Sequence, residues 1–205
     1  MARRRRKDAR PVEIIAAALA SFAERGYAAT KLEDVAAAAG ISKGTIYLYF
    51  QTKEQLFRAV VSQALLPNLE AAETQFACHD GSCADLLRAL AQRFLALLDS
   101  DLTAIPKLVI AESGNFPAIA QFYADTVLRR AFALVEGILA RGMERGEFRR
   151  MDVHTILPLF AAPFLLLAMW KHSLGRHTDL TFSPRAVADA HIDVLLRGLA
   201  PDQPS

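Results

Sequence analysis

The chain has 205 residues, of which 53% are hydrophobic, and a formal net charge of only +2. This composition suits one globular unit or two small ones with a sizeable core, and it excludes a low-complexity chain. The charge is unevenly placed, because residues 1–60 carry 11 Lys/Arg and 6 Asp/Glu whereas residues 61–205 carry 13 and 16. We therefore expect that only the first part of the chain contacts a polyanion.

No signal for export or membrane insertion is expected. Asp8, Arg10 and Glu13 interrupt the stretch that a secretory signal would need to be apolar. The longest apolar run, residues 157–170, is shorter than the ~18 residues that indicate a membrane span, and we interpret it as a buried helix. We expect a cytoplasmic protein with no membrane partner, in which both cysteines are reduced thiols.

The hydrophobic periodicity is helical nearly throughout, which predicts an all-α protein of about nine helices. The helices are expected at residues 11–25, 31–39, 43–50, from 53 onward, 84–98, 104–113, 117–145, from 153 through 170, and 184–197. The second, third and fourth starts depend on capping residues, which are Thr30 with Glu33, Ser42, and Thr52 with Gln55. Pro67 is expected to kink or end the fourth helix. We place residues 1–68 in an arm and helix-turn-helix domain, and residues 69–205 in a larger body.

Residues 31–50 have the spacing of a helix-turn-helix. Ala36 is small enough for two helices to cross closely, Gly40 suits a left-handed turn, and Ile46 anchors the second helix against the first. This places Lys43, Thr45, Leu48 and Tyr49 mostly on the outer face, where they would enter a DNA major groove. The alternative is a solvated helix whose tyrosines pack on neighbouring residues.

The DNA contacts predicted from the residues divide into base contacts and phosphate contacts. Lys43 can donate to guanine, and the Thr45 hydroxyl can reach a base or a phosphate. Tyr47 and Tyr49 carry hydroxyls at phosphate height, and Gly44 lets the backbone approach the duplex. The starts of the second and fourth helices, at Thr30, Lys31 and Lys53, would also face phosphates.

The run TKLEDVAAAAGISKGTIYLYFQTKEQLF resembles the DNA-binding domain of the TetR family of bacterial transcriptional regulators, and the resemblance covers about residues 12–60. It implies DNA contacts at Thr30, Ser42, Lys43, Gly44, Thr45, Tyr47, Leu48, Tyr49 and Lys53. Leu48 departs from the aromatic residue often found there, and a thymine methyl is an alternative partner for it. The resemblance also implies a homodimer, a palindromic operator, and repression that a small molecule relieves.

The basic run before the first helix contains Arg3, Arg4, Arg5 and Arg6. We expect it to form a disordered arm that enters a minor groove or follows phosphates. The alternative is a solubilising tail.

The body shows no catalytic set, since its histidines are far apart in sequence and no nucleophile or phosphate-loop motif is present. We therefore expect no enzyme and no cofactor. The loop CHDGSC between Cys78 and Cys83 lacks a usual zinc spacing, so idle thiols are favoured over a redox pair or a metal site. The rival functions are an architectural DNA-binding protein without an inducer and an enzyme with a DNA-binding domain.

Two roles are expected of the body, dimerisation and ligand binding. An apolar stripe on the last helix is formed by Ala188, Ile192, Leu195, Leu196 and Leu199. Together with the apolar helix that starts at residue 153, this stripe is predicted to supply most of a dimer interface. The alternative is that it packs only within its own chain, as part of an intramolecular core. An apolar pocket is predicted from aromatic and nearby polar residues: Phe94, Glu112, Phe116, Phe122, Tyr123, Phe160, Phe164, Met169, Trp170 and His172. The stretches KLVIAESGNFPAIAQFYADTV and TFSPRAVADAHIDVLLRGL resemble the C-terminal domain of TetR-type regulators akin to efflux-pump and multidrug-response repressors, which implies lipophilic or aromatic ligands.

Overall fold

The computed structural model describes residues 2–201, and side chains from Pro11 onward. It is all-helical, and no strand occurs within the described range. Its elements in chain order are α1 (Ala2–Arg25), α2 (Leu32–Ala38), α3 (Lys43–Tyr49), α4 (Lys53–Val60), η1 (Val61–Leu65), α5 (Leu66–Ala77), α6 (Cys83–Leu98), η2 (Asp101–Thr103), α7 (Ala104–Glu112), α8 (Pro117–Tyr123), η3 (Ala124–Leu128), α9 (Arg129–Glu144), α10 (Val153–His172), η4 (Leu174–Arg176) and α11 (Pro184–Leu199). The all-α prediction is confirmed.

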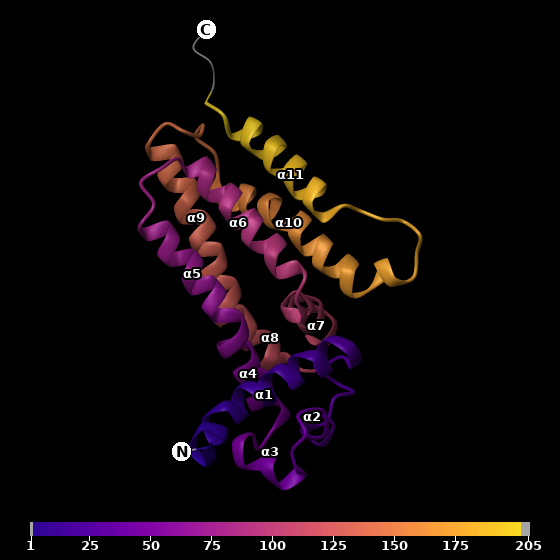
Figure 1. Cartoon of the computed structure of the whole chain (residues 1–205). Helices are drawn as coiled ribbons and strands as arrows, with labels where there is room; N and C mark the ends of the chain where they lie inside the picture. The colour runs from indigo at the N-terminus through magenta and orange to yellow at the C-terminus, as the bar shows by residue number, and fades with distance from the viewer. Residues whose placement is uncertain (1, 202–205) are drawn as a thin grey trace.

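A small head made by α1 to α4 lies at one end of an elongated helical body (Figure 1). In the body, α5 and α9 lie along one side, and α10 and α11 lie together on the other. The core of the head continues into the body, because Ile105, Ile119 and Tyr123 belong to the same buried cluster as Ile14 and Ile46. A second cluster fills the body between α6, α9, α10 and α11. The division near residue 68 stays a proposal.

Two long helices each contain one wider turn. The π-helical turn η1 joins α4 to α5, and the Leu66 N–H bonds to the Val61 carbonyl five residues back. Pro67 is the second residue of α5, after this turn, and it has no N–H for an ordinary helical bond to Gln63. The proline therefore neither ends nor sharply interrupts the helix, because the wider turn accommodates it. The second π-helical turn, η3, joins α8 to α9.

The first helix begins earlier than expected. We expected a disordered arm before Pro11, but α1 already begins at Ala2 and contains Pro11 in its interior. The backbone of Arg3, Arg4, Arg5 and Arg6 is therefore helical, and their side chains lie outside the described residues. The prediction of an arm without structure is wrong in this respect.

The apolar run of residues 157–170 belongs to a longer helical stretch than its composition suggested. The stretch Val153–Arg176 has 24 residues and consists of α10, a turn at Ser173 and η4. Its most apolar part has a mean hydropathy of 1.8, and the stretch is long and apolar enough to cross a membrane by length and composition. Of this most apolar part, 33% is buried inside the chain. Phe160, Phe164 and Leu167 form its inner face. Pro158 and Pro163 lie within this helix without ending it.

Candidate DNA interface and helical body

The helix-turn-helix has the predicted mechanics. Gly40 adopts a φ of +65°, a left-handed conformation that residues with a side chain rarely adopt. Ala36 and Ile46 are both buried where α2 crosses α3, with 2% and 0% of their surfaces exposed. Ser42 caps α3, because its hydroxyl accepts a hydrogen bond from the Thr45 N–H at 3.2 Å. The turn and the buried face of α3 thus fix which residues point outward.

A single carboxylate holds two of the predicted DNA-contact residues. The Lys43 ammonium lies 2.9 Å from Glu33 Oε1, and the Tyr47 hydroxyl donates to the same oxygen at 3.0 Å. Glu33 is on α2, so this pair of contacts links the two helices of the motif. The hydrogen bond from Lys43 is the main reason that the pKa of Glu33 is lowered to about 2, and the same contact raises the pKa of Lys43. The sequence suggests Glu33 only as the capping partner of Thr30 and gives no sign of its contact with Lys43 and Tyr47.

The remaining outer residues of α3 differ in how open they are. Leu48 is the most exposed large apolar residue of the head, at 84%. Gly44 is exposed, and a side chain there would meet nothing closer than Ser42 Oγ at 4.0 Å. Packing within the chain therefore does not require glycine at position 44. Tyr49 is half-buried against the head core, and Thr45 is half-buried with its hydroxyl 2.8 Å from that of Ser42.

Two predicted phosphate contacts point inward. Thr30 is 1% exposed, and its hydroxyl donates to the carbonyls of Gly26 and Ser21 at 2.7 and 3.3 Å. It does not cap α2, since Lys31 precedes that helix and its N–H donates to the Asp34 carboxylate at 3.3 Å. The predictions that the Thr30 hydroxyl caps a helix or faces DNA are therefore wrong, because it satisfies buried backbone carbonyls of the preceding turn.

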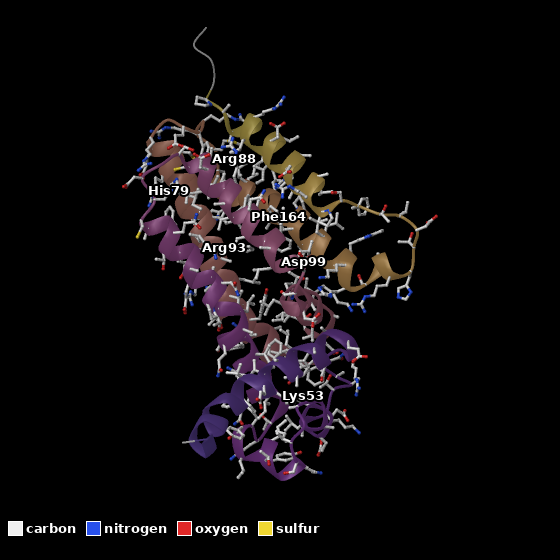
Figure 2. All side chains as sticks on the ribbon, viewed as in Figure 1. Lys53, His79, Arg88, Arg93, Asp99 and Phe164 are labelled. Carbon is white, nitrogen blue, oxygen red and sulfur yellow. The ribbon has the colours of Figure 1, made fainter. Side chains whose placement is uncertain are left out.

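Lys53 also faces the interior, at the junction between the head and the body (Figure 2). Its ammonium donates to the carbonyls of Tyr27 and Ala28 at 2.6 and 3.0 Å. It lies 4.5 Å from the centre of the Tyr27 ring and 5.5 Å from that of Phe116. Burial lowers the pKa of Lys53, the direction expected for an ammonium removed from water. Two carbonyls and two aromatic rings thus hold the Lys53 ammonium within the chain, and its expected phosphate contact stays a prediction.

The ten predicted pocket residues lie in three places rather than one. Phe94, Phe160 and Phe164 pack together in the body core, with ring centres 5.1 and 5.4 Å apart. His191, which was not predicted, packs against Phe164 at 5.6 Å. A second group of the predicted pocket residues lies at the junction between head and body: Glu112, Phe116, Phe122 and Tyr123. The third group of predicted pocket residues lies near the end of α10: Met169, Trp170 and His172.

The polar groups expected in the pocket have partners within the chain. The Glu112 carboxylate accepts the Ala28 N–H at 3.0 Å and so ties α7 to the turn after α1. His172 is 4% exposed, and its Nε2 lies 2.9 Å from the Thr103 hydroxyl. Its Nδ1 is buried without a partner in the part of the chain that the structure describes. Burial, followed by the nearby positive charge of Lys171, lowers the pKa of His172.

Arg93 on α6 is a polar candidate that the sequence did not reveal. Its Nη2 donates to Gln75 on α5 at 3.2 Å, and its Nε is buried without a partner among residues 11–201. Figure 2 labels it in the body, on the side of α6 that faces α5. Arg130, by comparison, forms a two-point contact with Glu73 at 2.6 and 3.0 Å. A partly buried guanidinium without a carboxylate is unusual, because desolvating it costs free energy unless acceptors are supplied.

Two surface grooves border α11. One, of about 500 Å³, lies between α6 and α11 and is lined by residues that include Arg88, Gln92 and Asp193. The other, of about 360 Å³, lies between α10 and α11 and includes Leu159 and Val194. None of the ten predicted pocket residues lines either groove in the described structure.

The structure offers little for metal or redox chemistry within residues 11–201. No group of three or more His, Cys, Asp or Glu side chains in that range could hold a metal ion. Cys78 is exposed and Cys83 is buried, and both are free thiols. Burial is the main cause of the raised pKa of Cys83, which leaves it a poor nucleophile.

The predicted dimer stripe on α11 faces its own body. Ala188, Ile192 and Leu199 are 1%, 5% and 1% exposed and belong to the body core. Leu195 and Leu196 are half-buried at the edge of the same core. The stripe therefore supplies an intramolecular core, because the most apolar face of the helix packs on α6 and α10. The outer face of α11 carries Val194, which is 69% exposed.

Comparison with known proteins assigns both parts of the chain. The model for bacterial regulatory proteins, tetR family, matches residues 14–60, and the model for a tetracyclin repressor-like C-terminal domain matches residues 79–195. The chain is 28% identical to the fatty acid metabolism regulator protein of Bacillus subtilis over 151 residues, covering 72% of this chain and 76% of the relative. It is 27% identical to the HTH-type transcriptional repressor KstR2 of Rhodococcus jostii over 196 residues, covering 95% and 93%.

A solved structure has the same fold. The transcriptional regulator FadR from Bacillus subtilis, in complex with stearoyl-CoA, superposes with a TM-score of 0.76 at 22% identity, covering 92% of this chain and 98% of that one. None of these three proteins is named as an efflux or multidrug repressor, so that subgroup stays a prediction. The two matched models together span more than half of the chain, and the relatives are named as regulators. The chain belongs to the tetR family of bacterial regulatory proteins, and it is a helix-turn-helix transcriptional regulator rather than an enzyme.

Proposed function

We propose that this regulator is a cytoplasmic repressor that binds a palindromic operator as a homodimer and is released by a lipophilic ligand with an anionic group. The DNA-binding mode is supported by the contrast between the buried face and the exposed face of α3. Ile46 is fully buried in the head core, whereas Leu48, two positions further on, is 84% exposed. Lys43, Tyr47 and Leu48 therefore project from a rigid support, as a helix in a major groove requires. Repression is supported by the relative KstR2, which is a repressor.

The dimer interface is proposed on the outer faces of α10 and α11. Leu159 and Leu166 on α10 are 56% and 54% exposed, and Val194 on α11 is 69% exposed. Ala162 and Ala190 are exposed at helical spacing between and beside them, so each helix presents one apolar stripe. Such a face is costly to leave in water, and pairing with the same face of a second copy about a two-fold axis would cover it. Pairing would form a four-helix bundle and would cover the outer side of the apolar helix α10.

The ligand class is proposed from the relatives and from Arg93. The structure of FadR from Bacillus subtilis is a complex with stearoyl-CoA, and the relative from the same organism is named a fatty acid metabolism regulator protein. These likenesses support a ligand with a long apolar chain. An anionic group on that ligand would give Arg93 Nε the acceptor that it lacks among the described residues. We therefore propose that Arg93 contacts the anionic part of the ligand.

The junction at Lys53 is proposed as the route by which a ligand changes DNA affinity. Phe116, at the start of α8, packs on Tyr27 with ring centres 4.9 Å apart, and Arg58 on α4 lies 4.6 Å from the centre of the Phe122 ring. A ligand that displaces α7 or α8 would therefore move α4 and the head. A ligand that favours the DNA-free state ~100-fold supplies about 2.7 kcal/mol of coupling.

Selection of bound sequences from a random duplex pool tests the DNA-binding proposal. We expect a palindrome whose half-sites are centred roughly 10 base pairs apart, or a near relative of that spacing. Lys43→Ala should abolish the enrichment while thermal unfolding remains cooperative. Enrichment of a single non-palindromic site, or of none, would contradict a dimeric operator-binding protein.

Titration of the operator complex with stearoyl-CoA, followed by fluorescence anisotropy, tests the ligand. We expect release of DNA by stearoyl-CoA and no release by coenzyme A alone. Arg93→Gln should require roughly tenfold more ligand, the effect of losing about 1.4 kcal/mol of a charged contact. Arg88→Gln is the matched control on α6, since Arg88 is paired with Asp85 at 2.8 Å. An unchanged response in Arg93→Gln would remove Arg93 from the proposal, and no response in the unmodified protein would exclude this ligand class.

A further inference from the structure

Glu33 shares one oxygen between the two polar side chains that α3 extends toward solvent. Lys43 Nζ and Tyr47 Oη lie 2.9 and 3.0 Å from Glu33 Oε1. The side chains of Lys43 and Glu33 are 69% and 38% exposed, so the three groups form a surface cluster rather than a buried one. Within residues 11–201, the contacts of this cluster lie wholly between α2 and α3, and no described residue of the body takes part in it.

We propose that Glu33 is a positioning residue that sets the DNA specificity of α3 by restraining Lys43 and Tyr47. This inference rests on the proposed operator binding and adds a specificity-determining residue to it. A lysine has three donors, and Glu33 occupies one of them, so the others remain available in a fixed direction. An unrestrained lysine on a flexible stem would instead turn toward the nearest phosphate of any sequence.

The negative charge of Glu33 also favours specific over non-specific DNA binding. Within the cluster it offsets the charge of Lys43, which weakens the sequence-independent attraction of the head for a duplex. Correct DNA offers acceptors to the two Lys43 donors that Glu33 leaves free, in the geometry that Glu33 maintains, whereas other sequences do not. The carboxylate thus lowers non-specific affinity more than operator affinity, and this difference is what specificity requires.

Binding of Glu33→Gln to two duplexes tests the proposal, one carrying the selected operator and the other a scrambled sequence of equal length and composition. We expect Glu33→Gln to bind the scrambled duplex at least about threefold more tightly than the unmodified protein does. The slope of log affinity against log salt concentration for this duplex should become steeper by up to ~0.9, because Lys43 then contacts a phosphate. The ratio of the two affinities should fall at least about threefold. Glu24→Gln is the control for loss of charge, since Glu24 is exposed on α1 and its nearest partner is Arg25 at 3.7 Å.

Glu33→Asp separates position from charge, because it keeps the carboxylate but withdraws it by one methylene. We expect this variant also to discriminate less well than the unmodified protein. An unchanged affinity ratio in Glu33→Gln, or a weaker operator complex without tighter binding to the scrambled duplex, would overturn the proposal. Discrimination by Glu33→Asp equal to that of the unmodified protein would do the same. Failure of the unmodified protein to prefer the operator would instead contradict the proposed function itself.

Discussion

The Lys53 ammonium lies 4.5 Å from the centre of the Tyr27 ring and donates to the carbonyl of the same residue at 2.6 Å. One side chain at the start of α4 therefore joins the turn between α1 and α2 to Phe116 of the body. The ring of Tyr27 also packs edge-on against Phe57, with centres 5.7 Å apart. The connection between head and body is thus aromatic and cationic as well as aliphatic.

Replacing Lys53 with methionine should destabilise the protein. The variant keeps the apolar stem but leaves the carbonyls of Tyr27 and Ala28 without their donor, at a cost of about 1–3 kcal/mol. Urea unfolding followed by circular dichroism measures the free energy of unfolding. Lys31→Met is the control, because Lys31 is an exposed lysine just before α2. Equal stability of the two variants would contradict a structural role for the Lys53 ammonium.

Replacing Gly44 with alanine should separate stability from DNA binding. An added Cβ meets nothing within the chain closer than 4.0 Å, and alanine is favoured over glycine in a helix by about 1 kcal/mol. We expect a higher unfolding temperature together with operator binding weakened about tenfold or more, because the methyl group would obstruct the duplex. Gly114→Ala, in a turn of the body with open space around it, should leave operator binding unchanged. Full operator affinity in Gly44→Ala would show that the backbone of α3 does not approach DNA closely.

The outer apolar face of α10 should control the oligomeric state. Leu159→Glu combined with Leu166→Glu places four carboxylates at a two-fold interface, and we expect monomers in analytical ultracentrifugation at micromolar concentration. Operator affinity should fall at least about a hundredfold, since one head then binds without the other. Ile110→Glu on α7 is the control, with 50% exposure compared with 56% for Leu159. A dimer that survives the double substitution would place the interface elsewhere.

His172 should make the folded state less stable in mild acid. Burial holds its pKa in the folded chain below the ordinary value of 6.5. Below pH 6.5 the unfolded chain therefore binds a proton that the folded chain does not, and stability falls until the pH reaches the folded pKa. Above pH 6.5 this group contributes no pH dependence. His191 has a pKa shifted in the same direction by burial and contributes in the same sense.

Thermal unfolding of His172→Gln between pH 8 and pH 5 measures this contribution. The variant should lose less stability on acidification than the unmodified protein, and a variant that also carries His191→Gln should lose less still. His154→Gln is a control at an exposed histidine near the start of α10. Parallel pH profiles in His172→Gln and the unmodified protein would show that the buried imidazole does not govern acid stability.

The local elements were largely predictable from the sequence, because their signals are local. Helical periodicity, the Ser42 cap and the left-handed Gly40 depend on residues within one or two turns of each other. The buried anchor Ile46 was predictable as well, because α3 packs on the helix directly before it in the chain. The all-α class and the exposure of Lys43 and Leu48 therefore followed from the sequence, as did the membership in a family that the comparisons show. Thr45 and Tyr49, also expected on the outer face, are instead half-buried.

Contacts between distant segments could be decided only by the tertiary structure. A lysine at position 53 could contact either a phosphate or a tyrosine ring, and the sequence does not distinguish the two. Lys53 and Tyr27 are far apart in the sequence, so only the tertiary structure reveals their contact. The stripe containing Ile192 is equally apolar whether α6 or a second copy covers it. The contact of Glu33 with Tyr47 and that of Arg93 with Gln75 gave no sequence signal, since one depends on the crossing of α2 with α3 and the other on the spacing of α5 from α6. Sequence determines which faces must leave water, and only the packed chain determines what covers them.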